Sequence, residues 1–216
     1  MEMVIDRNNS MVIKEYKRVN LLDDYFSRLK IIKQISMVFD LLTPTSFTVD
    51  GVTVFYYQEY IIKKRLPSDT KAIYHLLLTF AKEYDVVSEH GFVHGDINKK
   101  NVLYDGEKLL LCDLEPSLRQ IRNNRTMLMY TPPYVSKNDF LSGVLSSDTD
   151  KIGFYFLCYK LLGFKTEFDV KIIMGIRNAY RHNKADNWYS ILPFPEEELP
   201  DMSFRGLLDF AANQQK

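Results

Sequence analysis

Four polar residues lie close together between two apolar runs, in the stretch FVHGDINKKNVLYDGEKLLLCDLEPS at 92–117. These residues are Asp96, Asn98, Asn101 and Asp113. Asp105 and Gly106, flanked by apolar residues, predict a β-hairpin between the last two of them. Such a hairpin would bring Asn101 and Asp113 to one place, with Asp96 on the turn that precedes it.

These residue types and spacings suit phosphoryl transfer from ATP. The reaction needs little covalent chemistry from a protein, but it needs an acceptor for the proton of the incoming hydroxyl, oxygen ligands for Mg²⁺ and cations along the phosphates. Asp96 can accept the proton, and Asn101 and Asp113 can hold Mg²⁺. The stretch is therefore compatible with a phosphoryl-transfer site that uses Mg²⁺ and a nucleotide such as ATP.

The flanking segments predict an α+β chain in two parts. Residues 1–62 read as a small N-terminal lobe, with strands on either side of Asn8-Asn9-Ser10, a helix pattern over 21–42 and a hairpin at Asp50-Gly51. Residues 63–216 read as a mostly helical C-terminal lobe that begins with a long helix over 69–90. The boundary between the lobes is expected near residues 60–68.

The composition limits the partners. Lys plus Arg equals Asp plus Glu, at 28 each, so no net charge favours nucleic acid or an anionic membrane. No apolar run approaches the ~20 residues of a membrane span, and the N-terminus lacks the layout of a cleaved signal. Cys112 and Cys158 lie in apolar runs and read as buried free thiols, as in a reducing cytosol. We therefore expect a cytoplasmic monomer that binds neither nucleic acid nor membrane.

Four landmarks resemble the protein-kinase-like superfamily. HGDINKKN at 94–101 is similar to the kinase catalytic loop, and CDLE at 112–115 stands where the metal-binding Asp-Phe-Gly occurs. YTPPYVSKND at 130–139 resembles the end of a Ser/Thr-kinase activation segment. SSDTDKIGFYFLCYKLLG at 146–163 resembles the buried helix that follows, with Asp148 and Gly153 as its Asp and Gly. Their order matches that of the superfamily.

The resemblance implies a two-lobed protein-kinase-like fold with a reduced N-terminal lobe, a shortened C-terminal lobe and an ATP site between them. It implies that Asp96 accepts the proton of a Ser or Thr hydroxyl and that Asn101 and Asp113 hold Mg²⁺. Asn98 or Lys99 would steady the γ-phosphate.

The N-terminal lobe would supply the remaining contacts to ATP. In this resemblance, Lys14, in MVIKEY, pairs with the α- and β-phosphates. Gln58 takes the gatekeeper position, and the hinge residues Glu59, Tyr60 and Ile61 line the nucleotide site.

Several positions depart from the kinase pattern, including Gly95 and Asn98, which stand where kinases usually carry Arg and Lys. No glycine precedes Lys14, so the phosphate loop is absent or replaced by a short turn such as DRNNS at 6–10, whose amides would cap the phosphates. The helix over 21–42 contains no Glu, which leaves Asp23 or Asp24 as the partner of Lys14. Glu115 replaces the glycine of Asp-Phe-Gly and is either a third oxygen donor at the metal or a charge that faces the peptide.

Two features after Glu115 have two readings each. Thr131 either braces the catalytic loop through Asp96 or only precedes the rigid Pro132-Pro133. Three arginines either bind an acidic substrate or form a solvated edge: Arg119, Arg122 and Arg125.

A pared-down kinase of this kind resembles bacterial and secreted effector kinases. One such group phosphorylates a eukaryotic Hsp90-type chaperone, so the resemblance implies a Ser/Thr protein kinase with a protein substrate, for which such a chaperone is a candidate. It would act in the cytoplasm or, after secretion, in the cytosol of a host cell, with a role in virulence. Two alternatives stay open: a pseudokinase that binds without turnover, and a phosphotransferase acting on a small molecule such as an aminoglycoside or choline.

Overall fold

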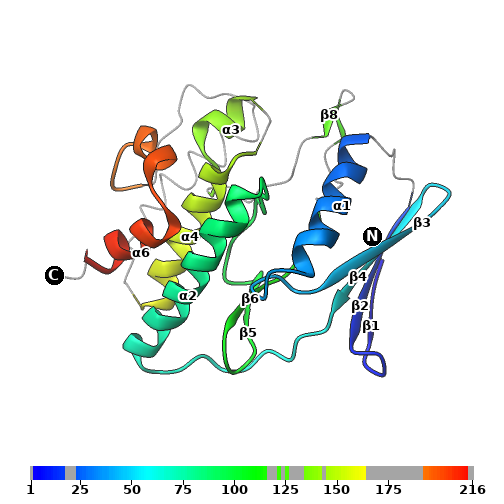
Figure 1. The fold of residues 1–216 in the computed structure, drawn as a ribbon, viewed down its shortest axis with the longest axis horizontal. Helices are drawn as coiled ribbons and strands as arrows, with labels where there is room; N and C mark the ends of the chain where they lie inside the picture. Colours follow the sequence, from blue (N-terminus) through cyan, green and yellow to red (C-terminus); the bar gives the residue numbers. More distant parts are fainter. Residues whose placement is uncertain are drawn as a thin grey trace.

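The computed structural model describes residues 2–17, 23–115, 121–122, 125–126, 134–142, 145–163 and 192–213. An antiparallel sheet with one helix forms the N-terminal part, and a group of helices forms the C-terminal part (Figure 1). A small hairpin lies between the two parts. This mixed α and β architecture confirms the predicted fold class.

The N-terminal sheet has four strands in the order β1-β2-β4-β3, all antiparallel. They are β1 (Glu2–Asp6), β2 (Met11–Tyr16), β3 (Thr45–Asp50) and β4 (Thr53–Glu59). Helix α1 (Asp23–Ser36) connects β2 to β3. Every second residue of β4 is buried, and Val54 and Tyr56 pack with Leu29 of α1 in a small apolar cluster. The alternation that defines a half-buried strand thus fixes which face of β4 meets the helix.

The register of β2 and β4 places a lysine on the buried face. Lys14 lies opposite Tyr56, and residues opposite each other in an antiparallel pair share a face. The Lys14 Nζ atom lies 5.7 Å from the centroid of the Tyr56 ring. A charged side chain that is buried in this way needs partners of opposite charge.

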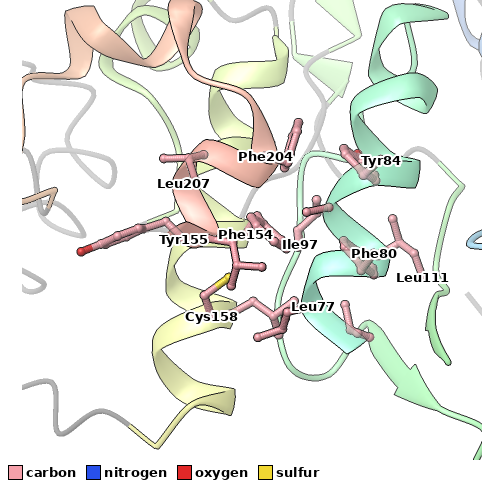
Figure 2. Packing of buried hydrophobic residues seen from close by; sticks show 14 of the residues in the cluster. Leu77, Phe80, Tyr84, Ile97, Leu111, Phe154, Tyr155, Cys158, Phe204 and Leu207 are labelled. Atoms are coloured by element: carbon pink, nitrogen blue, oxygen red, sulfur yellow. The ribbon is translucent and has the colours of Figure 1, made fainter. Parts of the chain in front are cut away.

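The C-terminal part is built on three helices that pack around aromatic residues. Helix α2 (Thr70–Glu89), whose first turn is capped by the Asp69 carboxylate, lies beside α4 (Ser147–Leu161), and α6 (Phe204–Asn213) packs against both. Phe80 stacks on Phe154 with 5.7 Å between ring centroids, and Tyr84 meets Phe204 at 4.7 Å. Figure 2 shows Ile97 among these side chains, so the residue that follows Asp96 is anchored in the core.

Shorter elements complete the described part of the chain. They are β5 (Val102–Tyr104), β6 (Leu109–Leu111), β7 (Ile121–Arg122), β8 (Arg125–Thr126), α3 (Lys137–Ser142) and the 3₁₀ helix η2 (Glu196–Asp201). Strands β5 and β6 pair antiparallel, which confirms the hairpin predicted at Asp105-Gly106. Thr131 and Arg119 lie outside the described residues.

Strand β6 ties the hairpin to the N-terminal part. The Leu111 N–H donates to the Leu41 carbonyl at 2.8 Å, and the Thr43 N–H donates to the Leu111 carbonyl at 3.0 Å. The domain boundary predicted between residues 62 and 63 lies within the segment 60–69, which connects β4 to α2. Among the described residues, none forms a helix long and apolar enough to cross a membrane.

Candidate active site

The loop of residues 94–101, which we name the catalytic loop after the kinase motif that it resembles, rests on a buried carboxylate at the start of α4. Asp150 Oδ2 accepts hydrogen bonds from the Tyr84 hydroxyl at 2.6 Å and from the His94 N–H at 2.7 Å, and Oδ1 accepts from the Gly95 N–H at 2.6 Å. Burial raises the pKa of Asp150, while His94 and the three donors favour its charged form. These contacts fix the backbone just before Asp96.

The aspartate assigned to this helix from the sequence is corrected by the structure. Asp148 was expected there, but Asp150 contacts the loop, whereas Asp148 pairs with Lys151 at 3.6 Å. Both acids lie in the first turn of α4, and only Asp150 faces the loop.

His94 connects the catalytic loop to the second aspartate. Its Nδ1 accepts from the Asp96 N–H at 3.1 Å, so its Nε2 carries the proton and donates to the Cys112 carbonyl at 3.0 Å. The Cys112 N–H donates to the Asn101 carbonyl at 2.9 Å. Both backbone groups of Cys112, the residue before Asp113, are therefore hydrogen bonded to the catalytic loop.

Two amides hold the carboxylate of Asp96. Asn98 Nδ2 donates to Asp96 Oδ1 at 2.9 Å, and Asn101 Nδ2 donates to Asp96 Oδ2 at 3.0 Å. Both amides also donate to the Asp96 carbonyl, at 3.0 and 2.9 Å. Lys99, on the same loop, is exposed. The structure thus brings Asp96, Asn98 and Asn101 together, as the sequence predicted, and fixes the orientation of the carboxylate.

Lys14 reaches across from β2 and meets two carboxylates. Its Nζ atom is hydrogen bonded to Asp113 Oδ1 and lies 2.5 Å from Glu115 Oε1. The Tyr16 hydroxyl donates to the same Glu115 oxygen at 2.7 Å. The contact between Lys14 and Glu115 was not predicted from the sequence, because these two residues are far apart in the chain. The helix acids Asp23 and Asp24, which are closer to Lys14 in sequence, were the expected partners.

The charges in this cluster stabilise one another. Burial opposes the charge of Lys14, but the Glu115 and Asp113 carboxylates outweigh it and raise the pKa of Lys14. Burial raises the pKa of Glu115 against the opposing effect of Lys14. For Asp113, burial is outweighed by the Lys14 charge, which lowers the pKa of that carboxyl. At neutral pH the lysine is therefore held as a cation.

The backbone of Asp113 has a conformation that is uncommon outside glycine. Its φ is 65°, and its N–H donates to Gln58 Oε1 at 3.0 Å. Left-handed backbone at a non-glycine residue costs energy and concentrates at functional sites. Gln58, predicted as the gatekeeper, thus holds the backbone of the candidate metal ligand.

The overall fold is similar to that of solved structures. The kinase PK-1 of Cydia pomonella granulovirus is similar over 74% of this chain, with a TM-score of 0.54 and 17% identity. The pseudokinase domain of BIR2, an immune regulator of the RLK/Pelle family, is similar over 99% of this chain, with a TM-score of 0.55 and 13% identity. The chain has a protein-kinase-like fold.

The similarity to each of these structures covers only part of the solved chain. The chain spans 62% of the length of the granulovirus kinase and 78% of that of the pseudokinase domain. No family model and no curated protein matches the sequence. At these identities the kinase-like fold is shared, while activity and substrate have to be argued from the site.

The hinge of this kinase-like fold follows directly after β4. Glu59 is the last residue of that strand, and Tyr60 and Ile61 begin the connection to α2. The Tyr60 N–H donates to the Ser10 carbonyl at 2.8 Å. The Glu59 N–H likewise donates to the Pro44 carbonyl at 3.1 Å, so an adenine ring bound here would have to use other backbone groups of the hinge.

The turn proposed as a substitute for the phosphate loop lies at the wrong end of β2. Ser10 neighbours the hinge, and Lys14 is four residues further along the strand, or about 13 Å. The Asp6 carboxylate already accepts from the N–H groups of Asn8 and Asn9, at 3.0 and 3.2 Å. The turn is therefore occupied by an anion and cannot cap phosphates held by Lys14, contrary to the sequence-based expectation.

Two residues of the kinase-like site have the right donors for Mg²⁺. The Asn101 amide nitrogen donates to Asp96, which leaves the amide oxygen as its metal ligand, and the Asp113 side chain is 48% exposed. Mg²⁺ usually takes one or two carboxylates together with phosphate oxygens and water, so these residues fit it. Within the described ranges, no group of three or more His, Cys, Asp or Glu side chains could hold a metal ion.

A glycine in α4 lets the catalytic loop approach the helix. A Cβ atom on Gly153 would lie 2.6 Å from the Ile97 carbonyl oxygen and 3.2 Å from the Ile97 Cβ atom. We expect Gly153→Ala to displace the loop and to lower the free energy of unfolding by about 1–3 kcal/mol. Thermal unfolding measures this loss, with Gly206→Ala as the control, since its Cβ would meet only the Ser203 hydroxyl at 3.4 Å. Equal unfolding temperatures for both variants and the wild type would contradict the close packing.

Proposed function

We propose that the chain is a Ser/Thr protein kinase that transfers the γ-phosphoryl group of ATP to a protein hydroxyl. The observation that carries this proposal is a set of contacts from two parts of the chain. Lys14 is bonded to Asp113, the Cys112 N–H donates to the Asn101 carbonyl, and the Asn101 amide donates to Asp96. A proton acceptor, two oxygen donors and a buried cation are the groups that phosphoryl transfer requires.

The geometry supports a separate role for each of these residues. The Asn98 and Asn101 amides hold the Asp96 carboxylate in one orientation, in which it can align the hydroxyl of a Ser or Thr and accept its proton. Lys14 can bind the α- and β-phosphates, and Asn98 or the exposed Lys99 can contact the γ-phosphate. When bound by Asn101 and Asp113, Mg²⁺ would neutralise charge on the β- and γ-phosphates.

We further propose that the phosphoryl acceptor is a protein and that the reaction takes place in the cytosol. The segment YTPPYVSKND resembles the part of Ser/Thr kinases that faces a protein substrate, and the similar granulovirus structure is a kinase. Two free buried thiols support cytoplasmic action, either in the parent cell or after secretion into a host, because free thiols are common in reducing compartments. A purified Hsp90-type chaperone is a reasonable first acceptor to test.

Transfer of labelled γ-phosphate with Mg²⁺ tests the function. Wild type and Asp113→Ala are incubated with the protein itself, an Hsp90-type chaperone, a eukaryotic lysate and a pool of small alcohols that includes an aminoglycoside and choline. We expect label in a protein band with wild type and its loss in Asp113→Ala, because the variant lacks a metal ligand. Label only in the small alcohols would instead establish a small-molecule phosphotransferase.

A nucleotide-binding pseudokinase is the second candidate. The similar BIR2 domain is a pseudokinase, and the Lys14 contact to Asp113 occupies the carboxylate that would bind metal. This function predicts that ATP raises the unfolding temperature equally with and without Mg²⁺, and that no acceptor is labelled. A rise that needs Mg²⁺ and disappears in Asp113→Ala favours the kinase.

A further inference from the structure

Lys14 has two carboxylate partners that differ in their access to solvent. The Asp113 side chain is 48% exposed, whereas the Glu115 side chain is only 3% exposed. A metal ion that arrives with a nucleotide can therefore reach Asp113 but not Glu115. The two carboxylates are placed for different tasks.

Glu115 is held by two contacts to one of its carboxylate oxygens. One of its oxygens, Oε1, accepts from both Lys14 Nζ at 2.5 Å and the Tyr16 hydroxyl at 2.7 Å. Its other oxygen, Oε2, is buried and has no hydrogen-bond partner. A buried carboxylate in this state costs energy unless a cation stays beside it. Glu115 therefore needs Lys14 whether or not a nucleotide is bound.

In protein kinases the phosphate-binding lysine is held by a glutamate of the helix that follows its strand. Helix α1 follows β2 here and contains no glutamate, and its acids Asp23 and Asp24 are the first two residues of the helix. Glu115, two residues after the candidate metal ligand Asp113, supplies a carboxylate instead.

We propose that Glu115 is the positioning residue for Lys14 and takes the place of the missing helix glutamate. Asp113 can then leave Lys14 for the metal while Glu115 keeps the ammonium group directed into the site. Because residues 113–115 carry both carboxylates, the segment that would bind the metal also orients the Lys14 side chain. The orientation of Lys14 then does not depend on the position of α1. This inference deepens the proposed function and rests on it, since it assigns a residue to the same nucleotide site.

A double-mutant cycle in nucleotide binding tests the inference without requiring turnover. The affinity for the non-hydrolysable analogue AMP-PNP with Mg²⁺ is measured by calorimetry for wild type, Glu115→Gln, Lys14→Met and the double variant. We expect Glu115→Gln to weaken binding about 10–100-fold, the cost that is typical for loss of a residue that orients a metal ligand. In the Lys14→Met background the same change should have almost no further effect, because the two residues act as one unit. Additive effects would overturn the proposal.

Two further variants separate the proposal from its rivals. Asp23→Asn/Asp24→Asn removes the helix acids, and Glu107→Gln makes the same chemical change as Glu115→Gln at an exposed site. Both should bind AMP-PNP as the wild type does. A loss in the Asp23→Asn/Asp24→Asn variant equal to that in Glu115→Gln would assign the positioning role to the helix.

Thermal unfolding without any ligand gives an independent readout. Lys14→Met leaves the buried Glu115 carboxylate without its cation, so the unfolding temperature should fall. Adding Glu115→Gln to Lys14→Met should restore part of the loss, and a further fall would contradict the pairing. If the wild type binds AMP-PNP but transfers no phosphate, the kinase function fails while the positioning role stands. If the wild type binds no nucleotide, both are overturned.

Discussion

Asp96→Ala is expected to lower the turnover of phosphoryl transfer about 10²- to 10⁴-fold, the usual contribution of a positioned general base. The Asp96 carboxylate is the group that Asn98 and Asn101 hold in place, and alanine cannot accept the proton of the incoming hydroxyl. The loop itself should survive the change, because both amides also donate to the Asp96 carbonyl, which remains.

Steady-state kinetics with ATP and an acceptor protein measure this loss, and the unfolding temperature shows whether the fold is intact. Glu107→Ala removes a carboxylate from the exposed tip of the β5–β6 hairpin and serves as the matched control, with unchanged turnover. Wild-type turnover in Asp96→Ala would remove this residue from the mechanism.

Asp150→Ala is expected to lower the free energy of unfolding by about 3–5 kcal/mol, the range for breaking a buried polar network. The change leaves two buried donors, the Gly95 N–H and the Tyr84 hydroxyl, and the half-buried His94 N–H without an acceptor. For a chain of this length the unfolding temperature should fall by about 10 °C. Since these donors fix the loop before Asp96, turnover should fall as well.

The control for this prediction lies in the same turn of α4. Asp148→Ala removes a carboxylate that pairs with Lys151 at 3.6 Å, and we expect it to cost about 1 kcal/mol. Calorimetric unfolding of both variants separates the two acids. A larger loss for Asp148→Ala than for Asp150→Ala would contradict the assignment of Asp150 to the catalytic loop.

Local chemistry made several parts of this site predictable from the sequence. Asp105-Gly106 between apolar runs predicted the hairpin. The hairpin is a local structure, so it brings β5 and β6 together independently of the rest of the chain. Asn98 and Asn101 are two and five residues from Asp96, so a single turn was enough to join them. Predictions that depended on residues near in sequence therefore agreed with the structure.

The features that were missed depend on three-dimensional relations that short patterns do not contain. Asp148 and Asp150 are both in the first turn of α4, and the rotation of that helix against the loop decides which one faces it. The role of Glu115 depends on a contact with Lys14 in a distant strand. The turn at 6–10 was expected next to the phosphates because the order of the strands was not known. That order decides at which end of the sheet the turn lies.

The most direct test of the site as a phosphoryl-transfer centre compares two positions of the label on ATP. Wild type, Asp96→Ala and Asp113→Ala are incubated with Mg²⁺ and an acceptor protein, once with label on the γ-phosphate and once with label on the α-phosphate. We predict that the acceptor is labelled only from the γ-position and only by the wild type. Label from the α-position, or equal γ-label with all three proteins, would contradict phosphoryl transfer by Asp96 and Asp113.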